Sequence, residues 1–551
     1  MEESNSNPMM NSVVLRNIFE MIPISDLKSC RQVCKPWYEE SLTRWRRDMW
    51  LKLQEENSSN DALTLTNFLE LSKANDSISD PSSIEKGTFK KFKLQGWHFN
   101  SENDELKTRF LKTYGPVMTH LEIEQSVFDS REDFESVVFQ SFPKLQSLSL
   151  NGNSYKVTEE QIKIVPPIND VLSNANKMSS VKDLQLNLWT HDGAASFPLS
   201  YLEFFANYPN LKNLKLCRFP WRIPNELNLE NLLRAMLTLS KNGGYSWALE
   251  NFATFHMYGY SYSQVISLLP QLQFPLISLT LDIGCNTRPS DFKMILKTYA
   301  NTLRKLVVYG SGHSLKLIED NPDFRIGVQL KSLTELRLFE TAASLNLNFL
   351  QFMPNLRSLF LVKEIDSTML NAAPFLSDPD LLRDLHNRQK EYDSGNPIAV
   401  YPIPNTDFSQ LRNTVLPGME ELVVFGKNNK VCTAKQIAAL SRMMPNLKRL
   451  RVGLENDGFR VVCNAWKELE VLIIQPCEVN NSGITGTIPG LPIQLPNLYD
   501  LTRLRYFIKD TTAPVPPCTR CSRITDEALW QCTRRSPPPF PDVRDWYSEM
   551  F

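Results

Sequence analysis

Residues 444–452 read MPNLKRLRV, and the same arrangement returns in MPNLRSLFL (353–361) and YPNLKNLKL (208–216). In each copy a Pro-Asn pair precedes the pattern L-x-x-L-x-(L/V), which places apolar side chains on one side of a short strand. Apolar helical stretches come before several copies, as in AKQIAALSRMM (434–444) and DFKMILKTYA (291–300). The recurring order of helix and then strand predicts a repeat architecture.

Further copies extend the array in both directions. The clearest lie at 142–150, 274–281, 300–308, 330–338, 417–425 and 466–474, weaker ones lie at 114–123, 178–186 and 247–255, and 89–99 is interpreted as an earlier strand. Most copies follow one another at intervals of roughly 20–40 residues, and the pattern resembles the leucine-rich-repeat class over residues 85–510. One unit cannot bury its own apolar stripe, but stacked units share a continuous core. We therefore expect a solenoid with parallel strands on its concave face and helices on its convex face.

The N-terminal stretch 13–39, VVLRNIFEMIPISDLKSCRQVCKPWYE, predicts three short helices. Apolar residues from Leu15 to Ile22 follow helical spacing, Pro23 ends that helix, and Pro36 fits the first turn of the third. We expect this third helix to carry apolar side chains as far as Leu51. So small a core usually needs a neighbouring domain or a partner.

The same stretch resembles the F-box through the elements L..IF..IP..DL and CRQVCKPWY, although Met10–Val13 replace the usual opening Leu-Pro-x-Glu. The resemblance implies docking on a Skp-type adaptor and, through it, on a cullin–RING ubiquitin ligase, with no catalytic residue and no cofactor in this chain. The implied adaptor-binding and core positions are Leu15, Ile18, Phe19, Ile22, Pro23, Leu27, Val33, Cys34 and Trp37.

The expected fold class is therefore α/β, with a three-helix F-box followed by a leucine-rich-repeat solenoid. The expected boundaries are 10–55 for the F-box, 56–85 for a linker, 86–510 for the repeats with an insertion at 365–415, and 511–551 for a C-terminal cap with a Pro-rich tail.

A substrate site is expected where side chains between the strand leucines leave the sheet. They are polar in the early units and apolar in the later ones, and an exposed apolar stripe usually marks a binding site. The candidates are Val307, Tyr309, Arg337, Phe339, Phe360, Val362, Val423 and Phe425. The insertion at 365–415 is an alternative cover for these side chains. Arg337, Arg449 and Arg451 are too few to decide whether a phosphorylated substrate is bound.

Other features of the sequence give weaker evidence about function. Cys518, Cys521 and Cys532 contain a C-x-x-C, but zinc needs about four ligands, so a cap with free thiols is favoured over a metal site. Lys90, Lys91 and Lys93 are interpreted as a solvated edge. With a formal net charge of -1 and no long apolar run, neither nucleic acid nor a membrane is expected as a partner. The expected location is the cytoplasm, the nucleus or both.

Two function classes follow. The first is a substrate-recognition adaptor of a ubiquitin ligase, which holds an unidentified protein substrate. The alternative is a repeat scaffold or inhibitor that binds a partner without a ligase. Because no nucleophile–base pair or catalytic motif occurs, a hydrolase is disfavoured.

Overall fold

The structure is a computed structural model in which the chain divides into two compact units. Unit 1 comprises residues 1–260 and 268–275, and unit 2 comprises residues 261–267 and 276–551. The described residues are 12–22, 24–54, 63–69, 89–100, 105–155, 167–175, 178–187, 199–217, 229–242, 245, 247–255, 267–283, 289–310, 328–339, 350, 352–362, 415–425, 432, 434–454, 456–474 and 498–509. The expected insertion, apart from Val415, and the expected C-terminal cap lie outside them.

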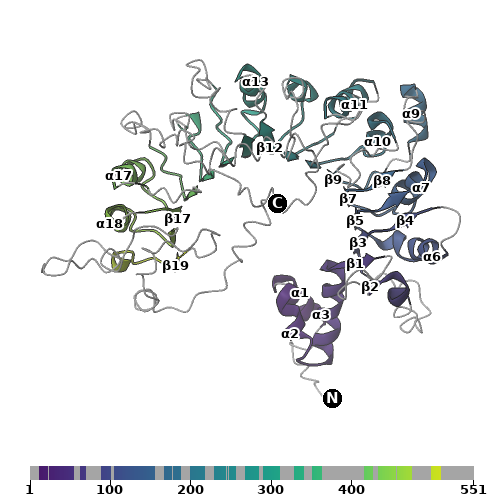
Figure 1. Ribbon diagram of the computed structural model, residues 1–551. Coiled ribbons are helices and arrows are strands. Elements are labelled where there is room, and N and C mark those ends of the chain that lie inside the picture. Colours follow the sequence, from purple (N-terminus) through teal and green to yellow (C-terminus); the bar gives the residue numbers. More distant parts are fainter. Residues whose placement is uncertain are drawn as a thin grey trace, which may run out of the picture. The chain divides into compact units, whose positions relative to one another are not determined.

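Unit 1 begins with the three expected helices, α1 (Ser12–Met21), α2 (Ile24–Cys30) and α3 (Lys35–Asp48), drawn in purple in Figure 1. Pro36 lies in the first turn of α3, where its missing N–H costs no hydrogen bond. The helix ends at Met49, whose backbone is extended and whose N–H donates to the Trp45 carbonyl.

The sheet begins earlier than expected. Strand β1 (Trp50–Gln54) follows α3 almost directly and pairs in parallel with β3 (Lys91–Gln95). Strand β2 (Leu63–Thr64) also pairs with β1 and lies within the residues expected as a linker. The third helix was expected to reach Leu51, but Leu53 matches Leu94 in register and is fully buried. Sheet pairing and burial therefore override the helical spacing.

The strands of unit 1 form a parallel ladder in which each residue of one strand matches one residue of the next. After β3 they are β5 (His120–Glu124), β7 (Ser147–Asn151), β9 (Asp183–Asn187), β10 (Asn213–Cys217) and β11 (Asn251–Phe255). The helical segments are α6 (Glu105–Tyr114), η2 (Gly115–Val117), α7 (Arg131–Glu135), η3 (Ser136–Gln140, a π turn), α9 (Ile168–Asn174), α10 (Tyr201–Ala206), α11 (Leu229–Asn242) and η4 (Leu269–Leu272). Helices α6, α7, α9, α10 and α11 lie along one side of the strands (Figure 1).

A second, short sheet was not anticipated. It contains β4 (His98–Phe99), β6 (Val127–Phe128) and β8 (Ser154–Tyr155), which pair in parallel. Each follows a main strand of unit 1 after a residue with positive φ, namely Gly96, Gln125 and Gly152. This backbone conformation turns the chain between the two sheets and suits glycine because it has no Cβ.

The strands of unit 2 also pair in parallel with matched registers. They are β12 (Ser278–Ile283), β13 (Lys305–Gly310), β14 (Glu335–Phe339), β15 (Ser358–Val362), β16 (Glu421–Phe425), β17 (Arg449–Val452), β18 (Val471–Ile474) and β19 (Tyr506–Lys509). The helices are α13 (Pro289–Tyr299), α17 (Ala434–Met443), α18 (Asn456–Ala465) and η7 (Leu498–Asp500).

The Pro-Asn pair of the repeat has a specific role. The side-chain amide of Asn210 donates to the Ser179 carbonyl at 2.8 Å. Asn355 and Asn446 donate to the corresponding carbonyls of Lys331 and Pro417 at 2.7 and 2.9 Å. Each asparagine thus links the turn before its own strand to the turn before the preceding strand. Its hydrogen bond satisfies a backbone carbonyl that has no partner in the strand pairing.

The leucines of the pattern form the core. The first leucines of three copies, Leu211, Leu356 and Leu447, are fully buried. Buried and partly exposed positions alternate within β3, β5, β7, β9 and β10, whereas β17 and β18 each have three consecutive buried residues. The structure is therefore mixed α/β with a large parallel sheet, as the leucine spacing predicted. Among the described residues, none of the helices has the length and apolar content that a bilayer crossing requires.

Candidate functional site

The three N-terminal helices pack around a small apolar core. Leu15, Phe19 and Leu27 are fully buried, and Trp37 contacts Phe19 edge to face with ring centroids 5.4 Å apart. Ile18, Ile22, Cys30 and Trp45 pack against this core and are partly buried. The side chains of Leu15, Phe19 and Leu27 therefore hold the helices together and leave no surface for another chain.

A different set of apolar side chains faces outward from the same helices. Met21 at the end of α1 is 79% exposed, Val33 in the turn before α3 is 60% exposed, and Tyr38 in α3 is 47% exposed. Val13 and Val14 in the first turn of α1 are also exposed. Exposed apolar side chains that gather in one patch usually mark an interaction site, so these residues are candidates for contact with a partner.

The predicted adaptor-binding residues thus separate into three groups by burial. Leu15, Phe19 and Leu27 are core, and Val33 is exposed. Ile18, Ile22, Cys34 and Trp37 are intermediate, and Pro23 lies outside the described residues. Sequence reasoning missed Val13, Val14, Met21 and Tyr38. The spacing of Val14 and Met21, two helical turns apart, was a usable signal for a second apolar side of α1.

Ion pairs join α1 to α3 around this core. The Arg16 guanidinium lies 3.4 Å from Glu40, and Arg47 lies 2.8 Å from Glu20. Arg47 also donates to Asp48, and this hydrogen bond lowers the pKa of the Asp48 carboxyl despite its partial burial. These pairs are partly exposed, so they orient the helices more than they stabilise them.

Residues 8–46 match the family model described as the F-box domain. The chain carries an N-terminal F-box domain. The match covers the three helices and ends within α3, before the first strand.

A search among characterised proteins gives one relative with a related segment. F-box/SPRY domain-containing protein 1 of Drosophila mojavensis is 39% identical over 61 residues. This alignment covers 10% of the present chain and 24% of the relative, so the chain spans about a quarter of that protein's length. The similarity supports an F-box protein and says nothing about the parallel sheet.

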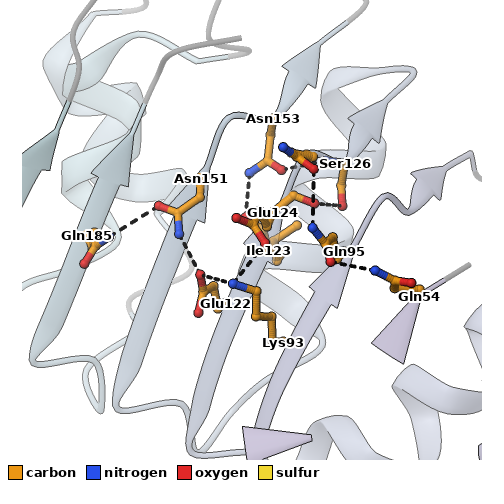
Figure 2. A network of polar contacts seen from close by, with 11 residues as sticks. Gln54, Lys93, Gln95, Glu122, Ile123, Glu124, Ser126, Asn151, Asn153 and Gln185 are labelled. Atoms are coloured by element: carbon orange, nitrogen blue, oxygen red, sulfur yellow. Dashed lines mark hydrogen bonds and ion pairs between the residues drawn. The ribbon is translucent and has the colours of Figure 1, made fainter. Parts of the chain in front are cut away.

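The exposed face of the unit 1 sheet is polar. It contains the side chains at the first, third and fifth strand positions, from Trp50, Lys52 and Gln54 on β1 to Asp183, Gln185 and Asn187 on β9. We call it the unit 1 face. Hydrogen bonds link its rows across the strands, from Gln54 to Gln95 at 2.7 Å and onward to Gln125 (Figure 2).

Lys93 lies at the centre of this network. Its ammonium group lies 3.0 Å from Glu122 and 2.9 Å from Glu124, and Glu122 also accepts from Asn151 (Figure 2). Burial alone lowers the pKa of Lys93, but the hydrogen bonds to Glu124 and Glu122 outweigh it, so the pKa is raised. Glu122 and Glu124 thus neutralise the charge of Lys93 within the unit 1 face. Lys93 therefore differs from the solvated basic edge that the sequence led us to expect.

Behind this face, polar side chains satisfy the backbone where the two sheets of unit 1 meet. The side chain of Asn153 accepts from the Ser126 N–H at 2.9 Å and donates to the Ile123 carbonyl at 3.1 Å (Figure 2). In the preceding unit, the Ser126 hydroxyl accepts from the Trp97 N–H, and the Trp97 indole donates to the Leu53 carbonyl. Equivalent positions of successive units thus form one buried ladder.

The apolar stripe expected in unit 2 is not exposed where the structure describes it. Val307, Phe360 and Val423 are only 4–5% exposed. Val423 lies between Phe360 and Arg451 in the strand register, and Arg337 stacks 4.6 Å from the Phe360 ring centroid. Long neighbours therefore cover the smaller side chains. The side chains of the remaining candidates, Tyr309, Phe339, Val362 and Phe425, lie outside the described residues, and a substrate role for the set stays a prediction.

The arginines considered for phosphate recognition are already engaged or buried. Arg337 pairs with Glu335 at 2.5 Å and Arg449 with Glu421 at 3.4 Å, while Arg451 is 5% exposed. A bound phosphate would have to displace these glutamates.

The C-terminal cysteines considered for zinc lie outside the described residues. Within the described part of the chain, no three His, Cys, Asp or Glu side chains are placed to hold a metal ion.

Proposed function

We propose that the chain is the substrate-recognition subunit of a cullin–RING ubiquitin ligase of the Skp–cullin–F-box type. The match of residues 8–46 to the F-box carries this proposal. F-box domains generally bind the Skp adaptor, and here a well-packed three-helix core presents exposed Met21, Val33 and Tyr38. We place the docking surface on these exposed side chains.

The rest of the chain is proposed to be a leucine-rich-repeat solenoid that holds a protein substrate. Parallel strands in matched register, intervening helices and the repeated asparagine turns support this assignment. The chain would perform no covalent chemistry. It would raise the local concentration of a substrate lysine near the charged ubiquitin carrier.

Calorimetric titration of the full chain with purified Skp adaptor tests the docking surface. Because a buried charge opposite an apolar surface is costly, we expect the double variant Met21→Glu/Val33→Glu to weaken adaptor binding by at least about a hundredfold. Gln32→Glu is the control, since it adds one negative charge at an exposed polar position beside Val33.

The native chain, the double variant and Gln32→Glu should have the same circular dichroism spectrum, because the side chains of Met21, Val33 and Gln32 lie outside the core. Unchanged affinity in the double variant would reject the surface. No binding by the native chain would instead favour the repeat scaffold without a ligase.

A further inference from the structure

A small patch on the unit 1 face differs from the network beside it. Trp50, Lys91 and His120 lie side by side in the strand register of β1, β3 and β5. The Trp50 indole meets the His120 ring edge to face, with centroids 6.2 Å apart, yet it remains 43% exposed. Strand β3, which carries Lys91, lies between β1 and β5, so the Trp50 indole must extend across the position of Lys91 to reach His120.

Two lysines of this patch keep their charge uncompensated. Lys52 is exposed and lies on the same face as Trp50, two residues further along β1. In contrast to Lys93, neither Lys52 nor Lys91 forms an ion pair within the described residues. Asp48, whose pKa the charge of Lys91 helps to lower, is already hydrogen-bonded to Arg44 and Arg47.

His120 adds apolar support and no charge at neutral pH. Burial, and then the positive charge of Lys91, lower the pKa of its imidazole below the ordinary value. The patch therefore combines two free ammonium groups with one exposed aromatic ring held by a neutral neighbour. Exposed tryptophans in a fixed position are typical of the centres of protein interfaces.

The charges around the patch limit the size of its ligand. Glu122 and Glu124 on β5 share the single charge of Lys93, and Asp183 follows two strands further along. A long polyanion laid across these strands would meet this acidic border. Nucleic acid needs an extended basic groove, whereas the charges of Lys52 and Lys91 match one or two carboxylates.

We propose that Trp50, Lys52 and Lys91 form a contact surface for a short acidic segment of a partner protein, one that carries a large apolar side chain beside its carboxylates. The apolar side chain packs on the Trp50 indole and the carboxylates pair with the lysines. Identifying this partner as the substrate of the ligase would rest on the proposed function. The contact surface itself is inferred from Trp50, Lys52 and Lys91 and does not depend on the proposed function.

Peptide display on the immobilised full chain, followed by fluorescence anisotropy, tests this surface. The anisotropy probes are a labelled peptide in which glutamates flank a phenylalanine, the same peptide with glutamines, and a labelled single-stranded RNA. We expect display to enrich peptides with acids next to an aromatic residue, and the glutamate peptide to bind best.

Lys52→Glu/Lys91→Glu should weaken the glutamate peptide by about tenfold or more, and Trp50→Ala by several-fold. Lys112→Glu reverses the charge of an exposed lysine on α6 and is the matched control without effect. The proposal is overturned if acids are not enriched, if the double variant binds like the control, or if RNA binds more tightly through the same residues.

Adaptor titration of the same variants separates this proposal from the ligase assignment. Lys52→Glu/Lys91→Glu should keep full adaptor affinity, because neither lysine belongs to the F-box surface. If the native chain bound the acidic peptide through these residues but did not bind the adaptor, the surface would stand and the ligase assignment would fall.

Discussion

At the scale of single residues, the buried ladder of unit 1 depends on Asn153. Its side chain satisfies the N–H of Ser126 and the carbonyl of Ile123, and it is only 2% exposed. Asn153→Ala leaves both backbone groups buried without partners, so we expect it to lower the free energy of unfolding by about 2–4 kcal/mol. The first urea transition of the full chain measures this loss.

Asn151→Ala is a control of the same residue type two positions earlier. Asn151 bonds to Glu122 on the half-exposed unit 1 face, where water can replace the lost contact. We expect a loss below about 1 kcal/mol. Equal losses for the two variants would mean that the ladder contributes no more than a surface hydrogen bond.

At the scale of elements, strand β16 places two adjacent glutamates in opposite environments. Burial raises the pKa of Glu421, although Arg449 and Ser358 oppose the change. A hydrogen bond from Lys448 lowers the pKa of Glu420 just before the strand. The two carboxyls should therefore contribute to stability with opposite dependence on pH.

For Glu421 the folded state has the higher pKa and binds more protons. Its contribution to stability is complete below the unfolded-state pKa of about 4.3 and is lost as pH rises through the folded-state value. Glu421→Gln should accordingly gain stability relative to the native chain as pH rises, and Glu420→Gln should lose it. Melting temperatures of the native chain and both variants from pH 4 to pH 8 check these opposite trends. If the difference from the native chain changed with pH in the same way for both variants, the prediction would be wrong.

Most of the main strands were readable from sequence because they have apolar residues at the three positions of the pattern L-x-x-L-x-L. Strand β1 was not, since Trp50 and Leu51 continue the apolar spacing of α3 and only pairing with Phe92 and Leu94 makes the segment a strand. Strand β19 was missed because Lys509 occupies the position of the third leucine, in register with Ile474 of β18. The two-residue strands β4, β6 and β8 have no periodicity to detect.

The candidate sites were harder to predict for a related reason. A short helix with apolar residues on two sides does not reveal which side is buried, and Phe19 proved to be core whereas Met21 is exposed. On the sheet, alternation correctly assigns Phe360 and Val423 to one face, but it does not show how far Arg337 and Arg451 cover them. Exposure depends on neighbours from other strands.

At the scale of the whole molecule, both units use the same tryptophan contact. The indole of Trp247 in unit 1 donates to the Tyr208 carbonyl at 2.7 Å, and that of Trp466 in unit 2 donates to the Met444 carbonyl at 2.6 Å. Each acceptor immediately precedes a Pro-Asn pair, and each tryptophan is at most 5% exposed. The two acceptors therefore occupy equivalent positions of the repeat, and a tryptophan from the following unit reaches each of them.

This equivalence allows a test of how stability is distributed along the chain. Either tryptophan changed to alanine should cost about 3–5 kcal/mol through the cavity it leaves. In a repeat array each unit contacts mainly its neighbours, so the damage should stay local. Hydrogen exchange of Trp466→Ala should accelerate in α17, β17 and α18 while α10, β10 and β11 keep their protection, and Trp247→Ala should accelerate exchange in α10, β10 and β11 while α17, β17 and α18 keep theirs. If either variant loosened both sets of strands equally, the chain would unfold as one cooperative body rather than as an array.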